Sequence, residues 1–567
     1  MLSSDCVFKK PYAKEIFGEE QSSYYAYSRE TLKNEPIFPY FVFDGGAFHF
    51  ANDRLGTTNS DELLELTMSG KLFDVFKRHG QFNWETSFSY TKDTDFTKKY
   101  EWQIWPQRLY MTLPVAQAFL RTGDTKYADC WLKIVKAWDE AHPYQEFDAS
   151  IPYIKTDMVW RDMQVAWRAL SLMHGLFMLQ EAPYSPEEWK YLYDFIELHI
   201  KHLYLESMDR LSRNHAQNHV LQIGVALIMA GAMFPEFDGH ERYIEIGKDT
   251  VKMNMEGAIF PDGGSNEDSP SYSHFIARLY LEAYLLLKNN RLPPIEGLEE
   301  SIQKQYNWLY MMTDPDGRVL RLSDSYSMDS YADIERAKKL ISLPLPVEKQ
   351  SIHFPDSKVA VLRNDSMLLV VDAMNELGGH RHYGRPQTLL FYDNEPILVD
   401  SGCCNYDIWD MYLYLRTAEA HNVVYSPDLP EAEWHITPAI RYFDAEERKI
   451  VVTNYTACQD KGYYWERSVQ CEDHRLIIQD YAQAPVDLNW VAKFHLARRD
   501  INIVQERCEI QQLTDQFLVK FNFDQPFDVG YAPVMNDNNK IDYSRCVTVK
   551  SFGWNFSLRT IIEFEER

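Results

Sequence analysis

The sequence predicts a multidomain α+β protein, in which a helical N-terminal domain is followed by an antiparallel β-sandwich. The 567 residues exceed what one hydrophobic core usually serves, so at least two domains are expected. Apolar residues recur at helical spacing up to about residue 345, and β-branched or aromatic residues alternate with polar ones after it. We therefore predict domains at 1–345 and 346–567.

The helical pattern is clearest where Tyr127, Trp131 and Trp138 fall on one face of a predicted helix. Ser185-Pro186-Glu187-Glu188 has the residues of a capping box, with Pro at the first helical position. Short connections between such helices predict stacked helical hairpins, in a solenoid or a closed toroid. Further apolar stripes span 109–119, 165–179, 220–233 and 275–287.

Strand signals begin after Leu343-Pro344-Leu345-Pro346. Asp393-Asn394 marks a tight turn, and no long helix separates the short segments, which indicates an antiparallel sandwich. The predicted strands lie in 358–362, 367–372, 388–392, 449–453, 475–479, 517–523 and 547–562.

Composition restricts the partners. Lys and Arg number 58 against 84 Asp and Glu, so the formal charge of -26 argues against nucleic acid or an anionic membrane surface. Aromatic residues make up 14%, which suits either stacking on sugar rings or packing between helices. The eight cysteines form no CxxC pair, and the first residues lack the apolar core of a secretory signal. We expect free thiols and a cytoplasmic protein, unless a leader has been removed.

Three polar segments carry groups that move protons. The first runs from Arg213 to His219, just before an apolar helix. The amide of Asn218 can donate to a carboxylate without carrying charge, and the adjacent His219 can accept a proton near neutral pH. The alternative is a polar loop whose Asn caps the helix.

The second segment, 260–274, is a turn rich in Gly, Pro and Asp that leads into a helix carrying Tyr272. A phenol beside a cation or a His can act as acid or base, although a single Tyr among 36 is usually a packing residue.

The third segment, 378–387, contains His380 and His382, which would share one face of a strand. Asp400 and His421 could complete a His-Asp-His set suited to zinc. A hydrogen-bonded polar cluster without metal is the equal alternative.

Taken together, these segments resemble the heparinase II/III-like polysaccharide lyases, and they occur in the family's order over roughly 100–480. The motifs are Asn218-His219, 230–236, Asp262-Gly263-Gly264, 267–272, 315–318 with Asp324, 379–382, 399–402 and 416–422.

The resemblance implies an N-terminal (α/α) toroid, a C-terminal antiparallel β-sandwich and no organic cofactor. It implies that Asn218 holds a uronate carboxylate with His219 beside it, and that Tyr272 and His380 are catalytic. It also implies a structural zinc ion in some members. The corresponding zinc ligands are His382, Asp400 and His421. Additional candidate substrate contacts are Arg213, Gln217, Glu267 and Arg416.

Two positions depart from the family pattern. Ser273 follows Tyr272 where the family commonly has His, which weakens a role for His274. Gly384 stands where the family often has Asp, which puts the support of His382 and the metal in doubt.

The implied activity is β-elimination in an acidic oligosaccharide or polysaccharide, most of all a glycosaminoglycan such as heparin or heparan sulfate, by a monomer or homodimer. Tyr272 and His380 would then lie in different domains across a cleft. An acidic protein that binds an anionic glycan also needs a local basic lining. Its candidates are Arg161, Arg168, Arg213, Arg381, Arg385 and Arg416.

Other functions remain open. Alginate, hyaluronan and chondroitin are alternative substrates for a lyase. A glycoside hydrolase on the same helical scaffold would use two carboxylates from among Glu267, Asp268 and Asp324. A zinc hydrolase or a non-catalytic glycan-binding protein are further alternatives.

Overall fold

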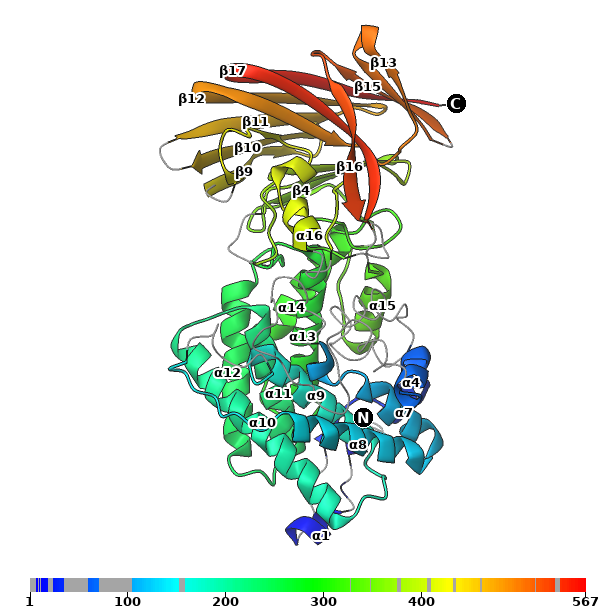
Figure 1. Ribbon diagram of the computed structural model, residues 1–567, viewed down its shortest axis with the longest axis vertical. Helices are drawn as coiled ribbons and strands as arrows, with labels where there is room; N and C mark the ends of the chain where they lie inside the picture. Colours follow the sequence, from blue (N-terminus) through cyan, green and yellow to red (C-terminus); the bar gives the residue numbers. More distant parts are fainter. Residues whose placement is uncertain are drawn as a thin grey trace. The chain divides into compact units, whose positions relative to one another are not determined.

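A computed structural model (Figure 1) divides the chain into two compact units. The first comprises Met1–Ile259 and His274–Ile302, and the second comprises Phe260–Ser273 and Gln303–Arg567. The structure describes residues 7–8, 10, 12–18, 24–34, 60–70, 105–151, 159–326, 328–346, 348–374, 379–404, 409–431, 435–458, 461–514, 516–535 and 541–566.

Helices dominate the first unit (Figure 1). Its short strands are β1 (Val7–Phe8) and β2 (Tyr24–Tyr25). The early helical segments are α1 (Ala13–Phe17), α2 (Arg29–Asn34), α4 (Ser60–Met68) and η4 (Trp105–Arg108). The longer helices that follow are α7 (Thr112–Thr122), α8 (Thr125–Ala141), α9 (Asp162–Met178), α10 (Pro186–Ser212), α11 (Asn218–Met233) and α12 (His240–Ala258).

Local signals explain where these helices begin. Ser185 Oγ accepts the Glu188 backbone N–H and the Glu188 carboxylate accepts the Ser185 N–H, so the predicted capping box is confirmed. Asp124 caps α8 by accepting the Lys126 N–H at 3.1 Å. Helix α11 is apolar on nearly all sides and almost fully buried, as expected for an inner helix. The residues that begin α11 are therefore held by a well-packed element.

Two helices continue from one unit into the other. Helix α13 (Pro270–Asn289) has its first turn in the second unit and the rest in the first, and α14 (Leu298–Met311) changes unit after Ile302. Helix α15 (Ser330–Leu340) belongs to the second unit. Helix α15 is the last helix before the strands and β3 (Ile352–Phe354) is the first strand after it, so the predicted boundary at residue 345 lies between them. The two compact units have different limits, because the second unit also contains residues 260–273 and 303–345.

Two antiparallel sheets form the rest of the second unit (Figure 1). The smaller sheet has the order β3-β4-β5-β6-β7. Its strands after β3 are β4 (Val359–Arg363), β5 (Met367–Asp372), β6 (Gln387–Tyr392) and β7 (Glu395–Leu398). The predicted turn Asp393-Asn394 joins β6 to β7, and both residues have positive φ, 50° and 68°. Such a pair matches the two-residue hairpin turn that follows the twist of the strands.

The larger sheet has the order β13-β14-β15-β17-β12-β11-β10-β9, with β8 paired to β12 and β16 paired to β17. Short helical segments α16 (Trp409–Leu415), η6 (Ala418–Ala420) and η8 (Gln505–Arg507) interrupt the strand region. The strands are β8 (Val424–Tyr425), β9 (His435–Asp444), β10 (Lys449–Cys458), β11 (Lys461–Cys471), β12 (Arg475–His495), β13 (Ile501–Val504), β14 (Glu509–Leu513), β15 (Phe517–Phe523), β16 (Asp528–Met535) and β17 (Ile541–Glu566).

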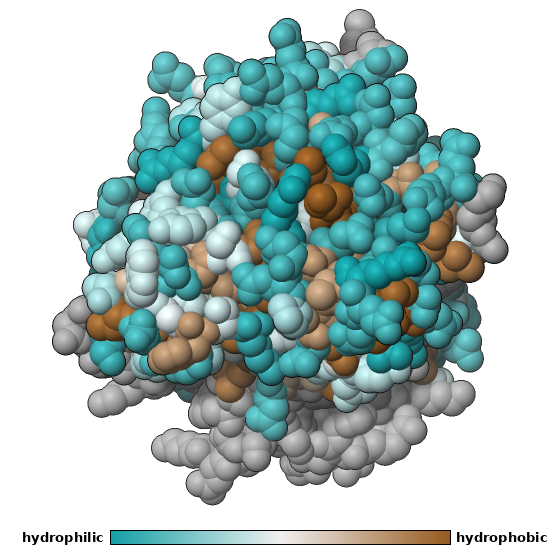
Figure 2. All heavy atoms as spheres, turned by 90° about the horizontal axis from the view of Figure 1, so that it is seen from above, coloured by the Kyte–Doolittle hydropathy of each residue, from teal (hydrophilic) through white to brown (hydrophobic). Residues whose placement is uncertain are grey.

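One hydrophobic core lies between the two sheets, since Leu369 and Leu390 of the smaller sheet cluster with Val469, Ile478 and Trp490 of the larger one. Buried side chains alternate with exposed ones along the strands of the larger sheet, and the exposed ones are polar residues together with aromatic ones such as Tyr455, Phe552 and Trp554. Figure 2, a view from above, shows a mostly hydrophilic surface with scattered apolar groups. This alternation is what a sandwich requires. The predicted order of a helical region followed by an antiparallel sandwich is confirmed.

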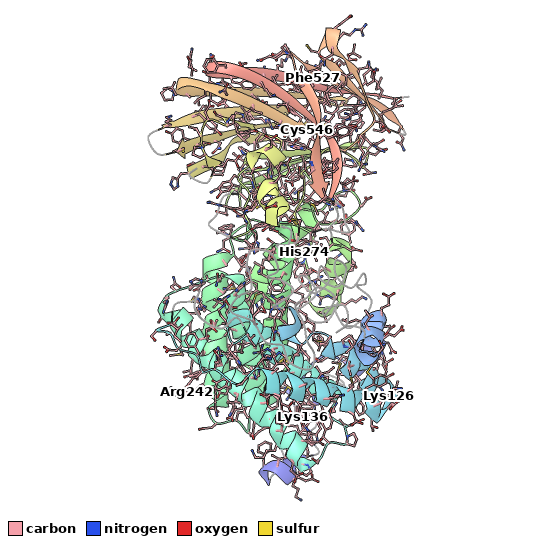
Figure 3. The ribbon with its side chains drawn as sticks, in the orientation of Figure 1. Lys126, Lys136, Arg242, His274, Phe527 and Cys546 are labelled. Atoms are coloured by element: carbon pink, nitrogen blue, oxygen red, sulfur yellow. The ribbon has the colours of Figure 1, made fainter. Side chains whose placement is uncertain are left out.

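Two expectations about the chain as a whole can be compared with the described residues. The described cysteines, among them Cys546 on β17 (Figure 3), are all free thiols, and Cys6 lies outside the described residues. No helix in the described part of the chain is long and apolar enough to cross a membrane.

Candidate active site

Tyr272 and His380 form the centre of the candidate site, and both belong to the second unit. Their rings stack with centroids 3.5 Å apart and an angle of 20° between the planes. Tyr272 lies in the first turn of α13 and is partly buried, and the His380 side chain keeps 15% of its surface exposed. Two groups that can exchange protons are therefore adjacent and accessible.

Asp324 binds the imidazole of His380 through its Nδ1. Its Oδ2 lies 3.1 Å from His380 Nδ1, and its Oδ1 lies 3.0 Å from Nε2 of His382. Burial alone would raise the pKa of Asp324, but the hydrogen bonds from His380 and His382 outweigh it and hold that pKa well below its usual range. A carboxylate only accepts hydrogen bonds, so both facing nitrogens carry protons. A neutral His380 therefore keeps its lone pair on Nε2.

The Nε2 side of His380 also faces a carboxylate. Glu267 Oε2 lies 3.6 Å from His380 Nε2, and Glu267 is buried. Arg416 completes this group: it donates from Nη1 to the carbonyl of Gly379 at 2.8 Å, and the same atom lies 3.8 Å from Asp324 Oδ2. Of the predicted substrate contacts, Glu267 and Arg416 therefore lie at the Tyr272–His380 pair.

A network of serines fixes the chain that carries Tyr272. The hydroxyls of Ser269 and Ser271 both donate to the carbonyl of Asp324, at 3.1 and 3.2 Å. Ser325 Oγ lies 3.0 Å from Ser269 Oγ and accepts the Ser271 backbone N–H at 3.3 Å. The start of α13 is thus tied to the segment that supplies Asp324. The Ser residues of the 267–272 motif have this structural role.

The Asp262-Gly263-Gly264 motif is also structural. Asp262 Oδ2 accepts the backbone N–H groups of Asp356 and Ser357 at 2.9 and 2.8 Å. Gly263 has a φ of 95°, and a Cβ there would lie 2.3 Å from the carbonyl oxygen of Lys304. Only glycine allows this approach.

The predicted metal ligands come together next to this group. His382 Nδ1 lies 3.1 Å from His421 Nε2, which lies 3.6 Å from Asp400 Oδ2, and all three side chains are 1% exposed. Burial lowers the pKa of His421 well below its usual value, so this imidazole is neutral. Its Nδ1 faces the carbonyl of Thr417 at 2.7 Å and must carry the proton, which leaves the lone pair on Nε2.

The facing nitrogens of His382 and His421 restrict where the protons of this cluster can lie. If His382 is neutral with its proton on Nε2, its Nδ1 lone pair faces the lone pair of His421 directly. Either a second proton on His382 or a metal ion relieves this contact. The separation of 3.1 Å is close to the roughly 3.3 Å between ligands in tetrahedral zinc sites. No group of three or more His, Cys, Asp or Glu side chains in the described ranges surrounds a common point as a preformed metal centre does.

The departure at Gly384 has a steric explanation. A Cβ at this position would lie 2.2 Å from Cγ and 2.4 Å from Cβ of His421. The imidazole of His421 therefore occupies the space in which an Asp side chain would begin, and an Asp at 384 is incompatible with the observed position of His421.

The candidates in the first unit form a separate group. Asn218 and His219 are the first residues of α11, and Gln217 precedes them. The carbonyl of Gln217 accepts a hydrogen bond from Asn254 Nδ2 at 2.7 Å, and Asn254 Oδ1 accepts one from Tyr280 OH at 2.8 Å. Helices α12 and α13 thereby fix the start of α11. Gln217, not Asn218, occupies the N-cap position of α11, and the Gln217 side chain forms no capping hydrogen bond.

Several expectations about individual residues are wrong. His380 and His382 lie in a turn and loop before β6, not on a strand; they share one side because both bind Asp324. Tyr272 and His380 lie on either side of the predicted boundary at residue 345, although both fall within the second compact unit. Arg168 and Arg385 do not line a surface: Arg168 is fully buried between Trp138 and Trp160, and Arg385 is buried with Asp372.

The remaining candidates differ in accessibility. Arg213 is exposed and paired with Asp209 at 2.8 Å, whereas Arg161 and Arg381 are partly buried. His274, labelled in Figure 3, is 1% exposed on α13. The sequence analysis named Asp324 as a hydrolase carboxylate and as part of a family motif, but it did not predict the position of Asp324 between the two histidines. The one signal for it was the place of Asp324 in the family-ordered motifs.

Comparison with known proteins extends these observations. The family model described as "Heparinase II/III N-terminus" matches residues 24–344, and the model "Heparinase II/III-like, C-terminal" matches residues 346–560. A heparin-sulfate lyase of Pedobacter heparinus is 24% identical over 250 residues, which cover 41% of this chain and 36% of the relative. A heparin-sulfate lyase of Bacteroides thetaiotaomicron is 22% identical over 400 residues, 61% of this chain and 54% of the relative.

The chain thus spans about a third to a half of the length of these curated relatives. Among solved structures, a heparinase III crystal structure superimposes with a TM-score of 0.70 at 17% identity, covering 86% of this chain and 79% of that one. This likeness shows the fold, a helical toroid followed by an antiparallel β-sandwich. Because the two family models together match most of the sequence, the chain belongs to the heparinase II/III family.

Proposed function

We propose that this protein is a polysaccharide lyase that cleaves a uronic-acid-containing, acidic glycan by β-elimination. The observation that carries the proposal is the stacked pair of Tyr272 and His380, with Nδ1 of His380 bound to the buried Asp324. Membership of the heparinase II/III family and the names of the relatives support the same reaction class.

The reaction removes the C5 proton of a uronate, forms a double bond between C4 and C5, and breaks the bond from C4 to O4. The enzyme must stabilise the carboxylate, accept the C5 proton and protonate O4. Asp324 keeps a proton on Nδ1 of His380, so Nε2 can accept a proton. The phenol of Tyr272 then supplies the complementary acid or base. Which of the two removes the C5 proton depends on the configuration of the substrate at C5.

Stabilisation of the carboxylate is assigned to Asn218, on the strength of the family resemblance. Its amide donates hydrogen bonds without adding charge, and Asn218 lies at the N-terminus of α11, where the helix dipole favours an anion. Arg416 is the cationic residue beside the Tyr272–His380 pair and is proposed to contact the acidic substrate.

The alternative hydrolytic reactions are less well supported by this geometry. The carboxylates available to a glycoside hydrolase, Glu267, Asp268 and Asp324, are 4%, 0% and 0% exposed. Asp324 is also engaged by two imidazoles. A zinc hydrolase would need an open coordination position, whereas the side chains of His382, Asp400 and His421 are each 1% exposed.

For the substrate, we propose a glycosaminoglycan of the heparin or heparan sulfate type, because the relatives that match are named heparin-sulfate lyases. Alginate, hyaluronan and chondroitin are the alternatives. Monomers and homodimers both fit the proposal.

We also propose that zinc, if the folded protein retains it, is held by His382, Asp400 and His421 and serves a structural role. The lone pairs on His382 and His421 support this assignment, and small side-chain movements would be needed to enclose the ion. Elemental analysis of purified protein tests it directly. About one zinc per chain that is lost, with a lower Tm, in His421→Ala would support the site; a metal-free protein with full activity would refute it.

The proposed reaction is tested by absorbance of the unsaturated uronate, with heparan sulfate, heparin, chondroitin sulfate, hyaluronan and alginate oligosaccharides. An increase with one glycan that Tyr272→Phe abolishes is expected, because this variant keeps the ring that stacks on His380 and removes only the hydroxyl. An unchanged Tm would show that the fold is intact. Cleavage seen by mass spectrometry without new absorbance would indicate hydrolysis and refute the lyase proposal.

A further inference from the structure

A buried carboxylate lies behind His219 in the first unit. Asp162 Oδ2 is 3.1 Å from His219 Nδ1, and the Asp162 side chain is 2% exposed while that of His219 is 27% exposed. The two residues are 57 positions apart in the sequence, at the starts of α9 and α11. Nδ1 of His219 therefore binds the buried Asp162, and Nε2 is the nitrogen that can bind a substrate.

The position of Asp162 is built into the fold. Its φ of 37° lies in the left-handed region, which is uncommon for a residue other than glycine, although Asp tolerates it better than most. Its own Oδ1 accepts the backbone N–H of Met163. Its backbone N–H donates to Glu206 Oε2 at 3.0 Å, and Glu206 Oε1 accepts Arg210 Nη2 at 2.8 Å. Asp162 is thus held by a second buried residue, Glu206, on helix α10.

The direction of each hydrogen bond fixes where the protons lie. The Met163 N–H occupies Oδ1, so the other oxygen, Oδ2, is the one that faces the imidazole. A carboxylate accepts, so His219 must donate from Nδ1. A neutral His219 then has its lone pair on Nε2. Without such a partner, the neutral imidazole of histidine prefers the opposite tautomer, with its proton on Nε2.

We propose that Asp162 is a positioning residue that holds His219 in the Nδ1–H form, so that Nε2 acts as a hydrogen-bond or proton acceptor toward the glycan. This inference rests on the proposed lyase function. Asn218 and His219 then have different roles, because the lone pair on His219 Nε2 repels a carboxylate but can accept a hydrogen bond from a hydroxyl or a proton during transfer. Asn218 would then hold the uronate carboxylate, and His219 would contact a sugar hydroxyl or accept a proton.

Asp162→Asn is the sharpest test because the amide cannot satisfy both neighbours. If its oxygen keeps the Met163 N–H, its NH2 group faces His219 Nδ1 and forces that nitrogen to become the acceptor. Asn also tolerates a positive φ, so the backbone can remain in place. Asp162→Gly is the second variant, since it removes the carboxylate altogether and suits the φ of 37°.

The readouts are the tautomer and the kinetics. Long-range 1H–15N spectra of histidine-labelled protein report which nitrogen carries the proton, and a His219→Gln spectrum identifies the His219 signals. Wild-type protein is expected to show the Nδ1–H form. Both Asp162 variants should lose it, with kcat/KM reduced roughly 10- to 100-fold, by analogy with the hydrogen-bond partners that orient metal-bound histidines. Asp194→Asn is the control, because Asp194 is an exposed carboxylate on α10 paired only with Lys190 in the described structure.

Three results would overturn the inference: an Nε2–H form in the wild type, an unchanged tautomer in both variants, or a changed tautomer with wild-type kcat/KM. A purely structural role would lower Tm without changing the tautomer. If wild-type protein cleaves none of the glycans, the lyase proposal fails, and the spectra of wild type and Asp162→Asn still decide whether Asp162 sets the form of His219.

Discussion

Replacing Asp324 by Asn should reduce both catalysis and stability, because this carboxylate accepts hydrogen bonds from two imidazoles at once. His380 Nδ1 and His382 Nε2 lie 3.1 and 3.0 Å from its two oxygens. An amide has one oxygen and one NH2 group, so one of the two imidazole N–H donors would face another donor. The change is nearly isosteric, so the effect reports on hydrogen bonding and charge rather than on volume.

The expected size follows from these contacts. A hydrogen bond to a charged group contributes about 1.5–3 kcal/mol, and losing the charge weakens one such bond while abolishing the other, which gives about 3 kcal/mol. For a unit of this size that corresponds to a decrease in Tm of roughly 5 °C. A mispositioned His380 should lower kcat by about 10²- to 10³-fold, within the range typical of general acid–base groups.

The assay is formation of the unsaturated uronate, with thermal unfolding measured on the same samples. Asp528→Asn removes the same charge at an exposed position of the second unit and serves as the control. The pH dependence gives a further check. The depressed pKa of Asp324 means that its stabilising effect is present above the unfolded value of about 4 and is lost as pH falls below it. Asp324→Asn with at least half of the wild-type kcat would refute the assignment.

Two further predictions concern buried positions. Gly384→Ala should displace the side chain of His421, because the new Cβ would lie 2.2 Å from its ring. We expect the free energy of unfolding to fall by about 1–3 kcal/mol or more, which a lower Tm would show. An unchanged Tm would contradict the packing described. Burial and the nearby Asp162 raise the pKa of Glu206 to about 7. Between about pH 4.5 and 7 the folded state therefore binds more protons than the unfolded state. The stability of the folded state decreases as pH rises through this window. The difference in Tm between wild type and Glu206→Gln should therefore shift in favour of the variant from pH 5 to pH 8, and a constant difference would argue against a raised pKa.

The sequence predicts the elements of the fold well, because their signals are local. The capping box at Ser185, the turn at Asp393-Asn394 and strands such as Met367–Asp372 depend on a few neighbouring residues. The family motifs also identified Tyr272 and His380, which the structure brings into contact.

The sequence could not predict the supporting contacts of the site. Asp324 lies 56 and 58 positions from the histidines that it binds, and Asp162 lies 57 positions from His219. No local pattern encodes such pairs. The same limitation explains why Arg168 was expected at a surface, since only the fold shows that Trp138 and Trp160 enclose it.

The second unit contains segments from before and after residue 346, which limits where this protein can be divided into fragments or joined to a relative. The segment that carries Tyr272 and the one that carries Asp324 both precede residue 346, yet they fold with the strands that follow it. A fragment that begins at residue 346 therefore lacks two of the three residues that form the stacked pair and its support. Exchanging sandwiches between relatives at that point would replace His380 while leaving Tyr272 and Asp324 in place, so an active hybrid would have to rebuild the contacts among all three residues.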